Sequence, residues 1–171
     1  MDATSEGERS PMKNRATVER KSDKELVITR TVDGPARIVF EAWTNTELFV
    51  RWWVPKSFGI TLRSYEADVR VGGAYRFVFG HGDGPPMAFF GKYLEVTPHA
   101  RLSWTNEEGE AGVVVTTVTF EEQGGKTLLV VHELHPSKEA LDAARASGAE
   151  AGTLEAFGQL EDLLRERVAV A

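Results

Sequence analysis

The spacing of apolar residues changes along this chain of 171 residues, and the change limits the folds open to it. From Gly59 to Leu134 apolar and polar residues mainly alternate, as in β-strands with one buried face. After Pro136 the apolar residues recur every three or four positions, which is typical of an amphipathic helix. Because short polar turns separate the strands, they predict an antiparallel sheet. Such a sheet needs a cover for one face, and the C-terminal helix can provide it.

Upstream of the alternating region the sequence predicts one strand and two short helices. Residues 25–32 alternate well enough for a first strand, and a Gly-Pro pair ends it. A helix follows, and the sequence Thr-Asn-Thr-Glu at 44–47 has the form of a capping box that starts a second one. Trp52 and Trp53 are adjacent on this second helix, so we expect one to be buried and the other partly exposed.

These patterns together predict an α+β fold. A curved seven-stranded antiparallel sheet wraps around a long helix from about Ala149 to Arg167, and two short helices follow the first strand. Twin glycines at 72–73 and 124–125 are expected to make turns between strands, because glycine adopts positive φ at little cost. A sheet wrapped around one helix encloses more space than the helix fills, so we expect an internal cavity.

One domain accounts for the length and composition. Residues 1–22 are polar and charged, and we expect them to form a mobile N-terminal extension because they bury too little apolar surface to offset their ordering entropy. Residues 23–168 are expected to form the single folded domain. The apolar content of 42% is enough for a real hydrophobic core in a chain of this size.

Composition also excludes several classes of function. A net charge of −6 argues against a nucleic-acid partner, which would require a basic surface. The chain has no cysteine, so disulfides, thiolate nucleophiles and zinc–thiolate sites are excluded. No apolar run approaches the roughly 20 residues of a membrane span, and the N-terminus lacks the apolar segment of a signal peptide. We therefore expect a cytoplasmic protein.

Several short motifs in a fixed order resemble a known superfamily. They are Phe-Glu-Ala-Trp-Thr at 40–44 with Arg-Trp-Trp at 51–53, Asp-Val-Arg-Val-Gly-Gly at 68–73 with Tyr-Arg at 75–76, Gly-x-Tyr-x-Glu-Val-x-Pro at 91–98, Arg-Leu-x-Trp at 101–104, Lys-Thr-Leu at 126–128 and Val-His at 131–132. In this combination the chain resembles the START-like, helix-grip superfamily, also called SRPBCC, over about residues 25–167. Within it the chain is similar to the branch named after the activator of the heat-shock-protein-90 chaperone ATPase.

The resemblance implies a helix-grip fold with a cavity, but it implies no single chemistry. Members of the superfamily include ligand binders, cyclases, hydrolases and co-chaperones. The family often has Gly-Trp in the last helix, whereas this chain has Ala156-Phe157, so the roof of the pocket is expected to differ.

Strand alternation and the helical stripe place a set of side chains on inward faces. We expect an apolar interior with Tyr75 or His132 as a polar anchor, although a one-residue error in register would turn a whole strand over. The alternative for Phe77, Phe89, Trp104 and Phe157 is plain packing in the core. The alternative for His132 is a hydrogen-bonded position within the core. The expected ligand-binding residues are Tyr75, Phe77, Phe89, Trp104, Val118, His132, Leu154 and Phe157.

No catalytic constellation, metal site or cofactor is expected. His132 and His135 lie on a predicted strand and face opposite ways, so they cannot share one metal ion. The carboxylates at 107–110 fall in a polar hairpin loop and are expected to be solvated, and no pair of carboxylates is recognisable in an apolar site. No serine has the Gly-x-Ser-x-Gly context of a nucleophile.

Three hypotheses about function remain. The leading one is a non-enzymatic module that holds a small hydrophobic molecule in its cavity. A chaperone-linked protein-interaction module is the alternative that the branch name suggests. An enzyme acting on a hydrophobic ligand in the same cavity is the third, and a buried cavity group with a strongly shifted pKa would favour it.

Overall fold

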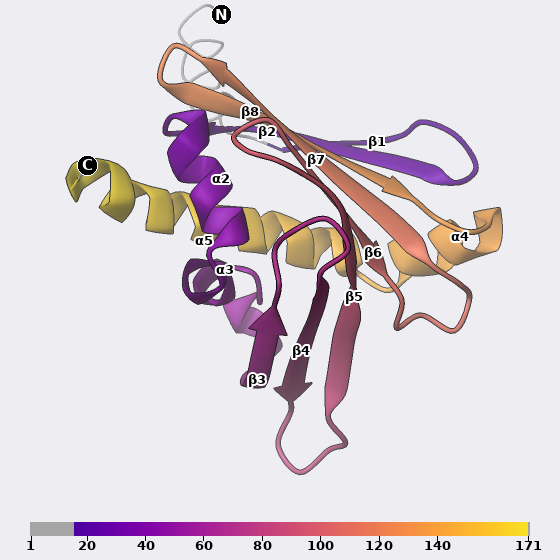
Figure 1. Ribbon diagram of the computed structural model, residues 1–171. Helices are drawn as coiled ribbons and strands as arrows, with labels where there is room; N and C mark the ends of the chain where they lie inside the picture. Colours follow the sequence, from indigo (N-terminus) through magenta and orange to yellow (C-terminus); the bar gives the residue numbers. More distant parts are fainter. Residues whose placement is uncertain (1–15, 171) are drawn as a thin grey trace, which may run out of the picture.

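The structure, a computed structural model, describes residues 16–170 (Figure 1). Its strands form one antiparallel sheet in the order β1-β2-β8-β7-β6-β5-β4-β3. The strands are β1 (Thr17–Arg20), β2 (Glu25–Asp33), β3 (Thr61–Ala67), β4 (Ala74–Gly80), β5 (Met87–Thr97), β6 (Arg101–Asn106), β7 (Val114–Gln123) and β8 (Lys126–Leu134). The helices are α2 (Ala36–Thr44), α3 (Thr46–Trp52), the short 3-10 helix η1 (Lys56–Phe58), α4 (Lys138–Ala146) and α5 (Ala149–Val170).

This architecture confirms the predicted α+β helix-grip fold and corrects its strand number. The sheet has eight strands within the described residues, not seven. The additional strand is β1, which pairs antiparallel with β2 from Thr17↔Thr29 to Arg20↔Leu26. We expected residues 1–22 to be mobile because they contain few apolar residues, but four of them form backbone pairs with β2. Residues 1–15 lie outside the described part of the chain.

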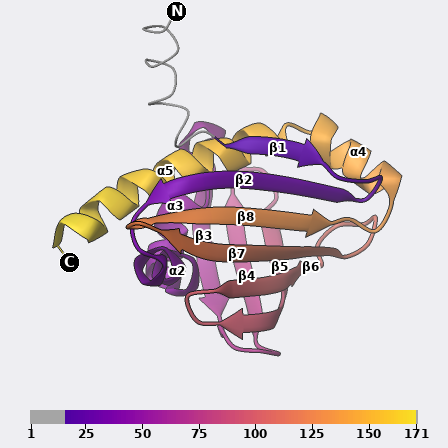
Figure 2. The same ribbon diagram turned by 90° about the horizontal axis from the view of Figure 1, so that it is seen from above.

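The sheet buries one face against α5, which runs across it (Figures 1 and 2). Strand alternation places Leu102, Val118 and Val131 opposite one another on β6, β7 and β8, and all three are buried. Phe157 and Leu160 on α5 are also buried in this core. The shared hydrophobic core therefore lies between the sheet and one long helix.

The helices α2 and α3 pack beside α5 through tryptophans. Trp52 is fully buried, and its indole nitrogen donates a hydrogen bond to the Ala42 carbonyl over 2.9 Å. Trp53 is only partly buried, which confirms the expected division between the two adjacent rings. Asn45 caps α3 by accepting hydrogen bonds from the backbone nitrogens of Glu47 and Leu48. The residue that caps α3 is therefore Asn45, the second residue of the capping box predicted at 44–47.

Polar and steric contacts fix α5 to the segment that follows α3. The Gln159 amide donates to the carbonyls of Trp52 and Val54, each over 2.8 Å. Nearby, a Cβ atom on Gly152 would lie 2.7 Å from the Phe58 ring, so glycine allows η1 to approach the helix closely. These contacts hold α3 and η1 against α5.

Local backbone requirements fix two of the loops. Ser137 caps α4 by accepting a hydrogen bond from the Ala140 nitrogen, and Gly148, with φ of 86°, breaks the helical segment between α4 and α5. In the β3–β4 connection a Cβ atom on Gly73 would lie 1.9 Å from the Asp68 carbonyl oxygen. Only glycine therefore fits that turn. None of the helices among residues 16–170 combines the length and apolar composition of a membrane-spanning segment.

The buried indole of Trp52 should carry much of the stability of this region. Replacing Trp52 with alanine is expected to lower the free energy of unfolding by about 3–5 kcal/mol, because the change leaves a cavity and an unpaired Ala42 carbonyl. Guanidinium denaturation measures this difference, with Trp53→Ala as the control that removes a half-buried ring of the same kind. An unchanged midpoint for Trp52→Ala would contradict the role assigned to this side chain.

Candidate functional site

The sheet, α2, α3 and the first half of α5 surround a partly open cavity of about 290 Å³. Its walls come from elements far apart in the sequence. Trp43 comes from α2 and Trp53 directly follows α3. Tyr75 and Trp104 come from the sheet, and Phe157 comes from α5. The cavity is therefore formed only when the long helix lies against the folded sheet.

One end of the cavity is aromatic and is organised around Trp43. The ring centroid of Trp43 lies 6.0 Å from that of Trp104, 6.2 Å from that of Trp53 and 6.4 Å from that of Phe157. The indole nitrogen of Trp43 is buried and is the one buried side-chain polar atom without a hydrogen-bond partner among residues 16–170. An N–H group in that state is costly unless something accepts its hydrogen bond.

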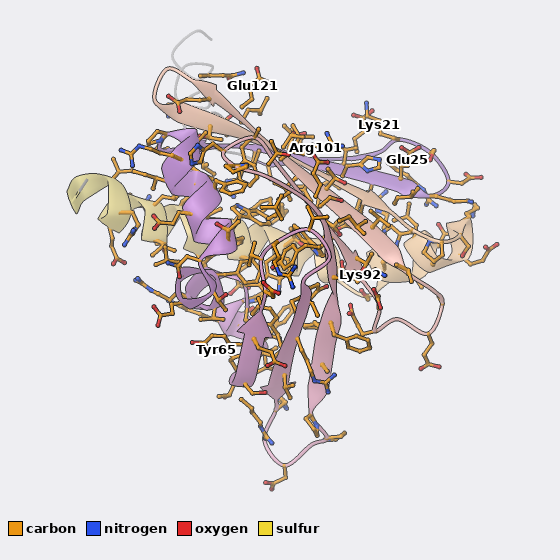
Figure 3. The ribbon with its side chains drawn as sticks, in the orientation of Figure 1. Lys21, Glu25, Tyr65, Lys92, Arg101 and Glu121 are labelled. Atoms are coloured by element: carbon orange, nitrogen blue, oxygen red, sulfur yellow. The ribbon has the colours of Figure 1, made fainter. Side chains whose placement is uncertain are left out.

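The wall continues to the edge of the sheet through stacked rings. Phe77 on β4 and Phe89 on β5 are directly opposite one another, and both line the cavity. Tyr65 lies outside them on β3 and is 42% exposed (Figure 3). Its ring is nearly parallel to that of Phe77, with centroids 6.3 Å apart. Tyr65 thus shields the outer side of the cavity wall.

The opposite end of the cavity carries a chain of hydrogen bonds. The Thr116 hydroxyl donates to the Asn106 side-chain oxygen over 3.1 Å, and the Asn106 amide donates to the Tyr75 hydroxyl over 2.9 Å. The Tyr75 hydroxyl in turn donates to the Thr105 carbonyl over 2.6 Å. Each side chain in this chain is oriented by its neighbour, which gives the cavity a fixed polar wall.

Burial perturbs the two tyrosines that line the cavity. Loss of solvent raises the pKa of Tyr75 far above its ordinary value, and the nearby charge of Glu108 adds to the effect. Burial alone raises the pKa of Tyr93 to about 12. Both phenols therefore remain protonated at neutral pH, and the Tyr75 hydroxyl both donates and accepts a hydrogen bond.

Two carboxylates line the same polar end. Glu108 follows β6 and accepts a hydrogen bond from the Phe90 nitrogen over 3.1 Å, and Glu133 lies on β8. Sequence reasoning placed Glu108 in a solvated charge cluster and recognised no pair of carboxylates in an apolar site. The structure corrects both points, because the half-buried Glu108 and Glu133 share a largely apolar cavity.

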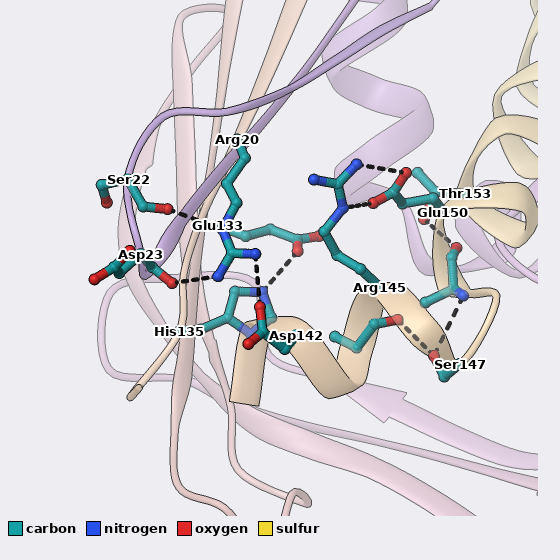
Figure 4. Close-up of polar contacts among 12 residues, drawn as sticks. Arg20, Ser22, Asp23, Glu133, His135, Asp142, Arg145, Ser147, Glu150 and Thr153 are labelled. Atoms are coloured by element: carbon teal, nitrogen blue, oxygen red, sulfur yellow. Dashed lines mark hydrogen bonds and ion pairs between the residues drawn. The ribbon is translucent and has the colours of Figure 1, made fainter. Parts of the chain in front are cut away.

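Glu133, which lines the cavity, also has polar neighbours just after β8 and on α4 (Figure 4). The Nε2 atom of His135 lies 3.1 Å from one of its carboxylate oxygens. Arg145, on the neighbouring helix α4, is hydrogen-bonded to Glu150. Thr153 on the first turns of α5 lies beside the cavity and also beside the small hollow that contains Arg145. Glu133 and Thr153 therefore border both the cavity and this small hollow, in which Arg145 is paired with Glu150.

The structure brings together five of the eight residues that the sequence singled out. Val118 is fully buried on the same sheet face, between Leu102 and Val131, but it does not line the cavity. Leu154 is half-buried on α5 and also lies outside the lining. The five residues that line the cavity are Tyr75, Phe77, Phe89, Trp104 and Phe157. Their role in ligand binding stays a prediction.

His132 requires a correction. Its position was expected to be inward together with Leu128 and Val130, but the fully buried residues of β8 are Thr127 and Leu129, and Val131 is nearly so. His132 is on the other face, where its Nε2 atom lies 2.9 Å from a Glu25 carboxylate oxygen. This hydrogen bond lowers the pKa of Glu25. The alternation had been assigned one residue out of phase, which turns every side chain of a strand over.

Sequence reasoning missed Asn106, Thr116 and the two glutamates. Each lies in or beside a strand of otherwise ordinary composition, so no local motif marks it. The pairing register of the strands would have identified Thr116 and Glu133 as inward-facing. One row of paired residues crosses β5, β6, β7 and β8, and it consists of Tyr93, Trp104, Thr116 and Glu133.

Comparisons with known proteins agree with this architecture. The family model described as activator of Hsp90 ATPase homolog 1-like protein matches residues 33–165. No curated protein matches the chain in sequence.

Solved bacterial structures show the same fold. A crystal structure of a Rhodobacter sphaeroides protein has a TM-score of 0.83 at 21% identity and covers 89% of this chain and 99% of its own. A Nitrosomonas europaea protein has a TM-score of 0.77 at 24% identity, covering 88% and 99%. A solution structure from Staphylococcus epidermidis has a TM-score of 0.75 at 26% identity, covering 88% and 94%.

The raised phenol pKa values give a test at alkaline pH. A tyrosine whose pKa is higher in the folded state stabilises the fold fully below the unfolded pKa of about 10, and this contribution is lost as pH rises toward the folded value. We therefore expect the free energy of unfolding to fall between about pH 10 and pH 12.

Phenolate absorbance checks the assignment. The chain has three tyrosines, so Tyr93→Phe should lower the titration amplitude by about a third in guanidinium. In the native protein, the same variant should leave the absorbance change up to about pH 11 nearly unaltered. Equal losses in the native and unfolded proteins would show that Tyr93 titrates normally.

Proposed function

The chain belongs to the activator of Hsp90 ATPase homolog 1-like family, and we propose that it binds a small hydrophobic molecule in the cavity between the sheet and α5. The partly open cavity with aromatic walls is the observation that carries this proposal. Ligand sites are usually apolar concavities with a few fixed polar groups, and this one combines aromatic walls with a hydrogen-bonded rim. The fold and family support a ligand-binding or protein-interaction module in general, and the cavity favours the first.

The size of the cavity limits its occupant. Its volume of about 290 Å³ is roughly twice that of an engineered apolar cavity of ~150 Å³ that binds benzene in another protein. A molecule with two fused rings or a comparable aliphatic body therefore fits.

The surface gives less support to a protein-docking function. The most exposed large apolar residues are dispersed: Val71 lies in the β3–β4 connection, Phe58 in η1 and Val113 in the loop before β7. Single exposed apolar side chains of this kind are normal on soluble proteins.

The perturbed phenol in the cavity fits binding better than catalysis. Tyr75 has a strongly raised pKa, which is the kind of signal that can mark an active site. Its hydroxyl, however, already donates to the Thr105 carbonyl and accepts from Asn106. A phenol held protonated in this way orients a wall of the cavity and is poorly suited to act as a base.

Ligand-induced stabilisation tests the proposal. A neutral two-ring probe, 2-ethylnaphthalene, should raise the melting temperature by about 5–10 °C near a hundredfold excess over its dissociation constant, because it binds the native state. Val131→Phe, which places a larger side chain in the cavity, should abolish the shift relative to its own ligand-free value. Val130→Phe on the opposite face of β8 is the matched control and should keep the shift. Absence of any shift in the wild-type protein would reject the proposal.

A further inference from the structure

We propose that the ligand carries a protonated amine or a similar hydrogen-bond-donating cation, which Glu133 and Glu108 hold at the polar end of the cavity while its apolar body lies against the aromatic end. This inference rests on the proposed function and adds the charge of the ligand. It follows from the kinds of side chain that form the cavity wall.

The ionisable groups of the wall favour a cation. Glu108 and Glu133 line the cavity, whereas no lysine, arginine or histidine among residues 16–170 does. An anionic ligand would have to leave water and enter a site whose described lining offers two carboxylates and no basic side chain. That arrangement disfavours carboxylates, phosphates and sulfates and favours a donor of positive charge.

Glu133 is placed to act as the main acceptor. It is directly opposite Thr116 on β7, so its side chain is on the inner face of the sheet. The side chain is 26% exposed, and one oxygen contacts His135. The second oxygen has no hydrogen-bond partner among the described residues, and the nearby Arg145 is paired with Glu150. Glu133 thus retains acceptor capacity toward the cavity.

Glu108 lies at the same polar end. Its negative charge contributes to the raised pKa of Tyr75, which places the carboxylate within electrostatic reach of that hydroxyl. Tyr75 is connected to Thr116 through Asn106, and Thr116 neighbours Glu133 across the sheet. The two carboxylates therefore border one continuous polar wall.

The aromatic side chains complete the match to an amphiphilic cation. Trp104 is directly opposite Thr116, so an indole ring adjoins the polar wall. Ammonium groups are attracted to the faces of tryptophan rings, and the attraction is stronger in a desolvated site. Trp43, Trp53 and Phe157 then provide an apolar surface for the ring system of the ligand.

Three probes with one naphthalene body separate charge from hydrophobicity. They are 2-naphthylmethylamine, 2-ethylnaphthalene and 2-naphthylacetate, which are cationic, neutral and anionic at about pH 7.5. Titration calorimetry at about 0.15 M salt, which screens the distant surface charges, gives each dissociation constant. The amine is expected to bind about tenfold or more tightly than the neutral probe, and the acetate more weakly than the neutral probe.

Charge-neutral variants test the assignment to these glutamates. Glu133→Gln and Glu108→Gln should each reduce the preference for the amine over 2-ethylnaphthalene several-fold, and together they should remove it. Glu110→Gln is the matched control, because Glu110 is exposed in the same loop as Glu108 and does not line the cavity. It changes the net charge equally and should leave the preference intact. Unfolding curves of each variant without ligand confirm that the fold is kept.

The possible outcomes distinguish the two proposals. If 2-ethylnaphthalene binds at least as tightly as the amine, or if the acetate binds best, the inference about charge is overturned while the hydrophobic site stands. If the amine is preferred but Glu133→Gln, Glu108→Gln and Glu110→Gln behave alike, the preference comes from net charge and the assignment fails. If no probe binds, the proposed function itself is rejected.

Discussion

The structure depends on the burial of one sheet face beneath a single helix. Eight antiparallel strands present a concave apolar surface, and α5 is the long element that lies across it. One helix is narrower than the sheet that it covers, so α2 and α3 must close part of the remaining space. They do so with Trp43 and Trp52, and Gln159 on α5 fixes the end of α3 through two backbone carbonyls. What these elements leave unfilled is the cavity, which is therefore a product of the architecture and not of a single motif.

The change of hydrophobic period was enough to predict the order of the elements and the helix-grip class, because both signals extend over many residues. Prediction failed where the signal was short or its phase was ambiguous. The strand β1 has only four residues and contains one large apolar side chain, Val18, so its composition resembles a polar extension. On β8 the sequence Leu-Leu-Val-Val at 128–131 is apolar on both faces, and alternation alone cannot say which residues point inward. The inner position of Glu133 follows only from the pairing with β7.

The candidate site was predictable in its apolar part and hidden in its polar part. Aromatic residues on inward positions are conspicuous in a sequence, and five of those singled out line the cavity. The polar wall is different, because Tyr75, Asn106 and Thr116 come from three strands and acquire a common role only through hydrogen bonds across the sheet. Glu108 belongs to a run of acidic loop residues, and its burial depends on how that loop folds back toward β5. Such features require tertiary structure.

Among residues 16–170 the open sheet ends in two edge strands, β1 and β3, and this has a consequence for self-association. Unpaired backbone groups on an edge strand can pair with another copy of the chain and begin aggregation. One edge here is β1, which is only four residues long and carries Glu19 and Arg20. The other is β3, whose pairing with β4 is interrupted by a bulge between Leu62 and Ser64, and which bears Arg63 and Glu66. Short length, charge and a bulge all oppose edge-to-edge addition of a further strand. The curvature that creates the cavity can thus be kept without closing the sheet into a barrel.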